Sequence, residues 1–527
     1  MSGYAWLAAF AAWAYDILRG PVYAHLAQLE SYQWTGYRRH HLKAVALPPD
    51  LWAWCIALLA GALWGIAGFG FVVVPAAVAL LACGAVLAVK AHRAQYKKPL
   101  VWTARVKRLV GAYAVIAALE VWAVARAYPP AALLIAGLPA LNMAAAIILT
   151  KPMEAAIQLR YKRRAKRRLR QLRDLHQLKV VGITGSYGKT STKHILGAIL
   201  GARYDVLITP ASYNTPMGIC KTINDQLASH HQVFVAEMGA RYKGDIRELV
   251  KLVEPDHSII TAVGPAHLDT MGSIEQIART KFDLARGTAQ GGVVVVNGDN
   301  EHCVREARTL GRPVLFYGLS GAPHLDAWAK DIRVDRSGTA FTLVLRGDAE
   351  IPCRTRLLGR HNVLNIVGAA LLARRLGLTP DEIHTGIGRI EPVEHRLQLI
   401  DPGNGAIVID DAFNANPEGA AQALEVLGQF QAYRKWLVTP GMVELGAASA
   451  DIHRRFGEQM AKVCDVVILV GRLNAAAMAE GLRAAGFPEA NLHFAKNLAE
   501  ATSLMQQLGF GRGDVVLFEN DLPDHLE

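Results

Sequence analysis

The segment LKVVGITGSYGKTSTKHILGAIL, residues 178–200, decides the fold of the larger part of the chain. Its apolar, β-branched start up to Ile183 predicts a buried strand, and the run that ends at Leu200 predicts a helix. Between them, Gly185 and Gly188 allow a turn whose backbone N–H groups face a polyphosphate at the N-terminus of that helix. This order of strand, glycine loop and helix predicts a phosphate-binding loop in an α/β domain.

The residues that follow the glycines carry the chemistry that a nucleoside triphosphate needs. Lys189 brings a positive charge to the outer phosphates, and the hydroxyl group of Thr190 can bind Mg²⁺. Ser191 is the last loop residue that we expect to contact the nucleotide. The strict pattern G-x-x-x-x-G-K-[ST] needs a glycine where this chain has Ile183, so a chance Gly-Lys-Thr turn is the alternative interpretation.

Three further apolar stretches, 233–236, 259–263 and 293–296, predict strands that end in polar residues. Glu237, His267 and Asn297 lie at or just beyond these ends. In open parallel sheets ligands bind at the carboxyl ends of the strands, and a carboxylate there can hold the metal ion that neutralises ATP. Each strand end taken alone is equally consistent with an ordinary turn.

Composition separates the chain into two parts. Of its 527 residues, 52% are hydrophobic and only 19% are charged, which excludes a disordered chain and a single small module. Residues 1–180 carry 23 Lys and Arg against 6 Asp and Glu, whereas the remainder carries 34 against 39. Eight of the ten Trp residues lie in the first part, where they suit a membrane interface. We therefore expect a membrane lipid partner and no nucleic acid.

The first part predicts a multi-pass membrane region. Residues 51–89 contain no charged side chain and are long enough for two spans, and Pro129-Pro130 separates a second pair. The expected spans are 51–70, 72–90, 109–128 and 131–149, and residues 4–18 form an interfacial helix or a fifth span. Buried helical hairpins in a soluble domain are the alternative to this interpretation.

Basic residues set the expected orientation. They precede the first span, join the two hairpins and follow the last span, whereas the other two turns carry no charge. By the positive-inside rule, we expect a protein of the cell membrane whose long C-terminal part is cytoplasmic. The scattered cysteines, without paired spacing, fit that reducing compartment and argue against a zinc site.

Two charged features of the membrane part leave alternatives open. Glu120 lies near the middle of the third span, where a functional carboxylate and a structural, protonated one are equally consistent with the sequence. Residues 160–173 contain nine Lys and Arg, which suits binding to anionic headgroups or a plain linker helix that stops transfer.

The motifs of the second part together resemble the Mur ligases, most closely the branch that adds D-alanyl-D-alanine to a muramyl tripeptide. The matching stretches are GITGSYGKTS from Gly182, AEMGA from Ala236, AHLD from Ala266, ARTK from Ala278, GRHNVLN from Gly359, EHR from Glu394, DDAFNANP from Asp410 and GMVELG from Gly441. Hydropathy and charge predict an N-terminal α-helical transmembrane region (1–157) and a basic linker (158–176). The resemblance implies an α/β P-loop central domain (177–395) and an α/β Rossmann-like C-terminal domain (396–527).

The resemblance also implies an activity. These ligases phosphorylate a carboxylate with ATP and then let an amine displace phosphate from the acyl phosphate, which forms an amide bond. For this chain the partners would be a cell-wall precursor carboxylate and an amino acid or dipeptide amine, in peptidoglycan synthesis. Closure of the C-terminal domain would exclude water from the acyl phosphate.

The resemblance also implies a role for each residue that matches a family motif. Thr190, Glu237 and His267 would bind Mg²⁺, and Lys281 would be the carbamylated lysine of the family. Lys189, Lys281 and Arg396 would be the catalytic residues. The nucleotide contacts would come from Gly185, Gly188, Lys189, Thr190, Ser191, Asn297, Asn362, Asn365 and Asp411. His361 is expected to be positional, and Asn214 and Gly218 match a short substrate-loop motif.

The chain departs from the family at both ends. The small domain that grips the UDP end of the substrate has no counterpart, because membrane spans occupy its place. Residues 518–521, Phe-Glu-Asn-Asp, stand where a Lys-Gly-Ser type ending is expected. Three interpretations follow: a ligase for a lipid-linked or otherwise unusual carboxylate, the usual UDP-linked reaction with a membrane anchor, and a non-catalytic ATP-binding scaffold. The intact motif residues disfavour the third.

Overall fold

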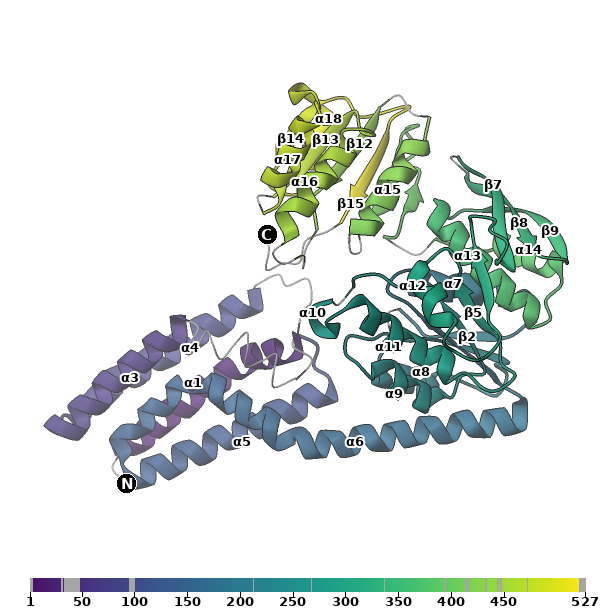
Figure 1. Ribbon diagram of the computed structural model, residues 1–527. Coiled ribbons are helices and arrows are strands. Elements are labelled where there is room, and N and C mark those ends of the chain that lie inside the picture. Colours follow the sequence, from purple (N-terminus) through teal and green to yellow (C-terminus); the bar gives the residue numbers. More distant parts are fainter. Residues whose placement is uncertain are drawn as a thin grey trace. The chain divides into compact units, whose positions relative to one another are not determined.

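The computed structural model consists of two units, residues 1–160 and 161–527. The described residues are 3–29, 32, 48–93, 100–211, 213–266, 268–335, 337–392, 395–412, 417–431, 434–442, 445, 448–471 and 473–520. Figure 1 labels the elements of both units.

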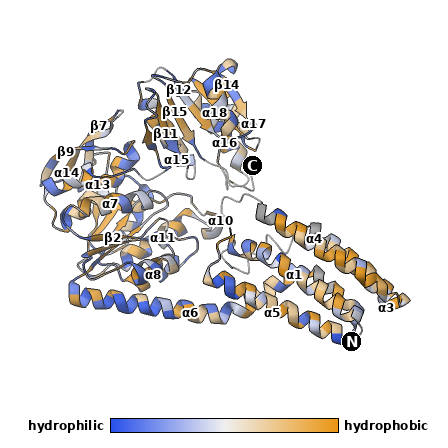
Figure 2. Cartoon of the chain, turned by 180° about the vertical axis from the view of Figure 1, so that it is seen from behind, coloured by the Kyte–Doolittle hydropathy of each residue, from blue (hydrophilic) through white to orange (hydrophobic). Residues whose placement is uncertain are grey.

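The first unit is helical. Its elements are α1 (Gly3–Leu29), α3 (Pro48–Ala67), the short 3₁₀ turn η2 (Gly70–Val72), α4 (Val73–Arg93), α5 (Ala104–Ala127), the 3₁₀ segment η3 (Pro129–Gly137) and α6 (Pro139–His176), which continues into the second unit. Among the described residues, three helices are long and apolar enough to cross a membrane: 70–90, 104–127 and 139–176. Figure 2 shows α3 and α4 largely in the colours of hydrophobic residues, and the end of α6 in those of hydrophilic ones.

The last expected span begins later than the sequence predicted. Residues 129–137 form a 3₁₀ segment, and the long helix starts only at Pro139. Consecutive prolines supply no N–H group for an α-helical ladder, whereas a proline at the first position of a helix costs nothing. The expected span 131–149 was therefore wrong at its start, and α6 runs from there without a break through the basic stretch.

Helix α1 is longer than the expected stretch 4–18. Its charged residues Asp16 and Arg19 are buried inside the helical unit rather than marking a helix end. The side-chain amide of Asn142 donates to Asp16 Oδ2 at 2.7 Å, and the Tyr113 hydroxyl donates to the Asp16 carbonyl at 2.9 Å. Because these buried groups are hydrogen-bonded, the helix continues past them.

The second unit contains two sheets. In the first, the order is β2-β3-β1-β4-β5-β6-β7-β8-β9 among the described residues, parallel up to β7 and antiparallel from β7 to β9. The strands are β1 (Lys179–Thr184), β2 (Val206–Ile208), β3 (Val233–Glu237), β4 (His257–Ile260), β5 (Val294–Asn297), β6 (Leu315–Gly318), β7 (Ala327–Asp335), β8 (Gly338–Leu345) and β9 (Ala349–Thr355).

Helices cover both faces of this sheet, because its strands are apolar on both faces. Neighbouring residues of β1 point to opposite sides: Val181 packs with α7 and α13, and Val180 packs with α8, α9 and α11. The helices are α7 (Lys189–Leu200), α8 (Pro216–Asp225), α9 (Asp245–Val253), α10 (Leu268–Met271), α11 (Ile274–Arg286), α12 (Glu301–Ala307), α13 (Arg360–Arg375) and α14 (Pro380–Gly388).

The second sheet has the order β10-β11-β15-β12-β13-β14 among the described residues, parallel except for the edge strand β10. Its strands are β10 (Gln398–Ile400), β11 (Ile407–Asp411), β12 (Lys435–Thr439), β13 (Val466–Val470), β14 (Leu492–Ala495) and β15 (Val515–Glu519). The helices that accompany it are α15 (Pro417–Gln429), α16 (Ser449–Met460), α17 (Ala475–Ala484) and α18 (Leu498–Gln507), with the 3₁₀ turn η5 (Glu489–Asn491).

Candidate active site

The glycine loop lies between a strand and a helix, in the order that its sequence predicted. β1 ends at Thr184, and α7 starts at Lys189 after Gly188, whose φ of +76° favours glycine. A Cβ atom on Gly185 would lie 1.9 Å from Thr261 Oγ1, so only glycine lets the loop pass this strand end. A Cβ on Gly182 would lie 2.7 Å from Leu284 Cδ1. The shifted glycine pattern therefore reflects two close contacts, one in the strand and one in the loop.

Glu237 at the end of β3 is the polar centre of the site. Its Oε1 accepts hydrogen bonds from the Thr190 hydroxyl at 3.2 Å and from the Asn214 amide at 3.1 Å. Its Oε2 lies 3.1 Å from Lys193 Nζ, and both side chains of this ion pair are fully buried. The structure thus brings the predicted residues Glu237 and Thr190 together in one contact.

These oxygens fit a magnesium ion. Mg²⁺ prefers hard oxygen ligands, and here a carboxylate and a hydroxyl group lie side by side at the start of a phosphate-binding helix. The third expected ligand, His267, lies outside the described residues. Within the described part of the chain, no cluster of three His, Cys, Asp or Glu side chains could hold a metal ion by itself.

Lys189 lies on the loop beside this centre. Its Nζ donates to the Ser186 carbonyl at 3.1 Å, which holds the side chain over the loop. Burial lowers the pKa of Lys189, the Glu237 carboxylate acts in the opposite direction, and the Arg396 guanidinium lowers it further. Lys189 and Arg396 therefore belong to one electrostatic cluster, although 207 positions separate them in the sequence.

Lys281 is buried on α11, with 2% of its surface exposed. Burial lowers its pKa to about 7, and the positive charge of Lys189 contributes in the same direction. The neutral amine is therefore far more accessible near pH 7 than in an ordinary lysine. A neutral amine is the form of lysine that reacts with carbon dioxide, so the environment of Lys281 is compatible with a carbamate.

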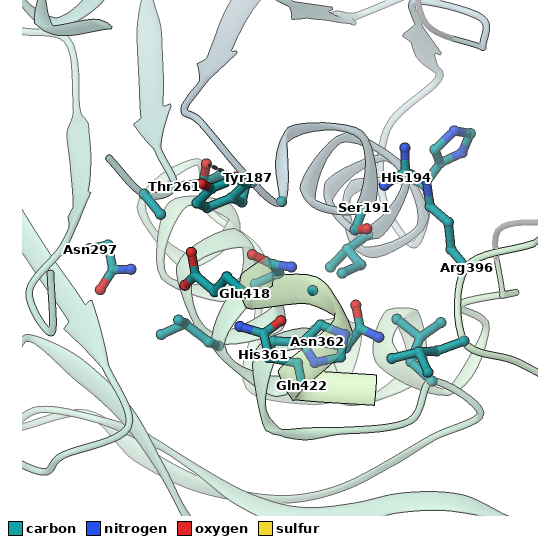
Figure 3. A pocket seen from close by; sticks show the side chains of 18 of the residues that line it. Tyr187, Ser191, His194, Thr261, Asn297, His361, Asn362, Arg396, Glu418 and Gln422 are labelled. Carbon is teal, nitrogen blue, oxygen red and sulfur yellow. Dashed lines mark hydrogen bonds between the residues drawn. The ribbon is translucent and has the colours of Figure 1, made fainter. Parts of the chain in front are cut away.

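A cavity of about 320 Å³ opens next to the loop, and Figure 3 shows the side chains around it. Seven predicted site residues line it: Gly188, Ser191, Asn297, Asn362, Asn365, Arg396 and Asp411. Gly185, Lys189, Thr190, Glu237 and Lys281 are not among the lining residues. The predicted residues therefore fall into two groups: one lines the cavity, and the other lies around Glu237 or beside the loop.

Helix α13 supplies one wall of the cavity. The Asn362 amide donates to the Leu358 carbonyl at 2.9 Å, and a Cβ on Gly188 would lie 2.8 Å from Asn365 Oδ1, so Asn365 packs against the loop. Burial lowers the pKa of His361 to about 4, which keeps its ring neutral at pH 7. Figure 3 places His361 and Asn362 close to Gln422 and Glu418.

The C-terminal part of the second unit contributes a partly buried acid. Asp411 ends β11, and its Oδ1 accepts a hydrogen bond from the Leu397 N–H at 3.1 Å. Burial raises the pKa of Asp411 to about 6, against the opposing effects of that N–H and of the Arg396 guanidinium. Figure 3 shows Arg396 at the edge of the cavity.

Several side chains of the site were not predicted. Lys193 was missed as the partner of Glu237, although it lies four residues after Lys189 and therefore one helical turn along the same face. Tyr187 and Glu418 line the cavity, and burial raises the pKa of both. Asn214 was matched only to a short loop motif, and its contact with Glu237 gives it a defined place.

Comparison with known families identifies two domains. Residues 183–373 match the Mur ligase middle domain, and residues 395–519 match the Mur ligase, glutamate ligase domain. The UDP-N-acetylmuramoyl-tripeptide–D-alanyl-D-alanine ligase of Bacillus subtilis is 31% identical over 350 residues, which cover 65% of this chain and 72% of that protein. The ligase of the same name from Escherichia coli is 32% identical, over 56% of this chain and 65% of that one.

Solved structures show the same relationship. MurF from Acinetobacter baumannii superimposes with a TM-score of 0.60 at 28% identity, and covers 69% of this chain and 77% of its own. MurF from Thermotoga maritima in complex with ADP superimposes with a TM-score of 0.60 at 27% identity, over 68% of this chain and 80% of its own.

Proposed function

Because the chain belongs to the Mur ligase family of ATP-dependent, amide-bond-forming ligases, we propose that it joins a carboxylate of a peptidoglycan precursor to an amine. The observation that supports this most strongly is the contact of Thr190 with Glu237 beside Lys189, at the N-terminus of α7. In the proposed domain assignment, residues 177–395 form the ATP-binding domain, residues 396–527 the C-terminal domain and residues 1–157 a membrane region.

The proposed reaction has two steps. A carboxylate oxygen of the first substrate attacks the γ-phosphorus of ATP, the bond to the bridging oxygen breaks, and ADP leaves. The amine then attacks the carbonyl carbon of the acyl phosphate, a C–N bond forms, the C–O bond to phosphate breaks, and the amine loses a proton. Two anions must meet in the first step, so the residues have to supply positive charge rather than a nucleophile.

Lys189 and Arg396 fit that requirement. Both are cationic side chains that act on each other electrostatically, and the Glu237 carboxylate acts on both. Thr190 and Glu237, with His267, would hold Mg²⁺, which when bound neutralises phosphate charge. Glu237 is in turn held by Lys193 and Asn214, which fix the position of its two oxygens.

We assign Lys281 as a carbamylated lysine. Its neutral amine would attack carbon dioxide, form an N–C bond and release a proton. The product carries a negative charge in place of a positive one. The burial of Lys281 and its pKa of about 7 support this assignment, because an ordinary lysine would be almost fully protonated at neutral pH.

The relatives suggest the substrates. Their names describe a UDP-N-acetylmuramoyl-tripeptide and D-alanyl-D-alanine, and we propose a muramyl peptide and an amino acid or dipeptide for this chain. Apolar helices precede the ligase domains in this chain. We therefore propose that the muramyl peptide is lipid-linked and that the helical unit spans the cell membrane, with the ligase domains in the cytoplasm.

Exposed arginines on α6 support a lipid partner. Arg163, Arg164 and Arg167 are exposed on the part of α6 that follows the apolar segment. Basic side chains at that position attract anionic headgroups at the cytoplasmic surface.

The activity is tested with the full chain in detergent, by ATP-dependent phosphate release across a panel of muramyl peptides combined with amino acids and dipeptides. We expect release that requires both a carboxylate and an amine, and no release by Lys189→Ala. Turnover by Lys189→Ala within tenfold of the parent chain, about 1.4 kcal/mol, would contradict the assignment of the nucleotide site.

The lipid-linked substrate is tested with the full chain in phospholipid nanodiscs. We expect a higher kcat/KM for a lipid-linked muramyl tripeptide than for the UDP-linked form, because a shared membrane raises the effective concentration of the carboxylate. Turnover of the UDP-linked form, with no turnover of the lipid-linked form, would contradict this proposal and leave the helical unit with the role of an anchor.

A further inference from the structure

Glu519, the last residue of β15, has an unusual environment. Only 1% of its surface is exposed, and its Oε2 accepts a hydrogen bond from the Thr439 hydroxyl at 2.7 Å. Its Oε1 is buried too, and no described residue donates a hydrogen bond to it. A buried carboxyl oxygen without a donor is unfavourable, and a bound group that donates to it is one explanation for its presence in a native structure.

The polar groups around Glu519 are already paired with each other. The Thr439 hydroxyl also accepts from the Gly441 N–H at 3.0 Å, and the Asn520 amide donates to the Gly441 carbonyl. Asn474 donates to the Pro440 and Met442 carbonyls at 3.2 and 3.0 Å. These hydrogen bonds fix the strand ends around Glu519, and none of them satisfies its Oε1.

The charge around Glu519 selects the kind of ligand. Asp411 lies opposite Glu519 in the register of β11 and β15, so two carboxyl groups end neighbouring strands. Burial raises the pKa of Glu519 to about 8, and the nearby Asp411 contributes in the same direction. An ammonium group would supply the missing donor, and its positive charge would favour the ionised form of Glu519, whereas a ligand carboxylate would do neither.

Glu519 does not line the cavity itself, but it lies next to a residue that does. Asp411 is one of the residues that line the cavity, and Glu519 is its neighbour on the adjacent strand. Both residues lie at the carboxyl ends of parallel strands, the edge at which open α/β sheets bind ligands. Glu519 also belongs to residues 518–521, the stretch in which the sequence departs from the ending expected for the family.

We propose that Glu519 Oε1 accepts a hydrogen bond from an ammonium group of the amine substrate, which makes Glu519 a specificity-determining residue. This inference rests on the proposed function, because it assigns the amine site of the same ligase. The amine substrate then carries an ammonium group, and no carboxylate, at the position next to Glu519.

The test compares two nucleophiles in the same reaction mixture. The mixture contains the full chain in detergent, ATP and a muramyl peptide that the chain uses in the phosphate-release experiment. D-Alanyl-D-alanine is the probe that carries an ammonium group. Hydroxylamine, which is small and neutral at pH 7.5, traps the acyl phosphate as a hydroxamate without the amine site. We expect Glu519→Gln to raise the KM for the dipeptide at least tenfold and to leave hydroxamate formation within twofold of the parent chain.

Two further variants test whether the effect is specific to the carboxyl group of Glu519. Glu519→Asp retains the carboxyl group, so its KM should lie between those of the parent chain and Glu519→Gln. Glu489→Gln removes a carboxylate from an exposed ion pair with Arg483. It should change neither the KM for the dipeptide nor hydroxamate formation. Melting temperatures show whether each variant is folded.

The outcomes separate the two proposals. Amide formation by Glu519→Gln with an unchanged KM, or equal effects of Asp and Gln, would overturn the role of Glu519 and leave the ligase assignment in place. A parent chain that forms neither hydroxamate nor amide would overturn the proposed function, and this inference with it.

Discussion

Lys189 and Lys193 lie one turn apart on α7, yet their side chains make different contacts. Lys189 lies over the loop, where a phosphate would lie, whereas Lys193 is fully buried and pairs with Glu237. The sequence predicted the first role because the loop motif is local. It could not predict the second, because the Glu237 partner comes from a strand more than forty residues away.

Replacement of Lys193 tests the buried ion pair. Lys193→Met would leave the Glu237 carboxylate buried without its cation, and we expect the free energy of unfolding to fall by about 3–5 kcal/mol. The measurement is thermal or chemical denaturation, with the exposed Lys221→Met as control. The double variant Lys193→Met, Glu237→Gln should regain most of the stability and remain inactive. Unchanged stability of the single variant would show that the pair contributes nothing.

Replacement of Lys281 tests the carbamate. Lys281→Ala should lower turnover at least tenfold, and a short carboxylate such as acetate should restore part of it by occupying the space of the lost group. Lys251→Ala, which changes an exposed lysine of the same domain, is the control. Full activity of Lys281→Ala would remove the carbamate from the mechanism.

The pH dependence gives an independent check on Lys281. Because its pKa is about 7, the neutral amine becomes scarce as the pH falls below 7. Turnover at pH 6 should therefore rise when bicarbonate is added to the parent chain, and it should not rise in Lys281→Ala. The same response in both proteins would point to another group.

At the scale of elements, α6 is the clearest difference between expectation and structure. The basic stretch was expected to bind headgroups or to form a linker helix after the last span, and it is the end of one 38-residue helix that already contains the apolar segment. Within the second unit, Leu169 and Leu172 on one side of this stretch belong to the hydrophobic core, and Arg173 contacts the Val253 carbonyl and Asp256. A charge pattern alone does not show which arginines a neighbouring domain uses.

The two sides of α6 should respond differently to substitution. Arg173→Ala removes hydrogen bonds to the C-terminal end of α9 and to Asp256, so we expect a loss of about 1–3 kcal/mol in unfolding free energy. Arg163→Ala, on the exposed side of the same helix, should stay within about 0.5 kcal/mol of the parent chain. Equal losses of unfolding free energy in the two variants, measured by denaturation, would contradict the packing of this side of α6.

Other elements followed from local patterns where one motif specified them. Strand, loop and helix at residues 179–200 have the predicted order, because glycine placement and apolar periodicity act over a few residues. The antiparallel strands β7 to β9 were not predicted, since their pairing joins distant residues. The segment at Pro129 was misjudged because two prolines still permit a 3₁₀ turn.

At the scale of the whole molecule, the proposed topology is tested by cysteine labelling of the full chain. With Cys55 and Cys83 replaced, single cysteines at residues 68–70 should label from outside the cell. Single cysteines at residues 100–108 should label only after permeabilisation, because basic loops stay in the cytoplasm. The reverse pattern would overturn the orientation and place the ligase domains outside.

The central claim is that the chain makes an amide through an acyl phosphate, and one isotope experiment tests it directly. The muramyl peptide is prepared with ¹⁸O in its reacting carboxylate and incubated with the full chain, ATP and the accepted amine, and the released phosphate is analysed by mass spectrometry. We predict one ¹⁸O atom in each phosphate, since the carboxylate oxygen attacks phosphorus and leaves with it. Amide product accompanied by phosphate without ¹⁸O would contradict the account.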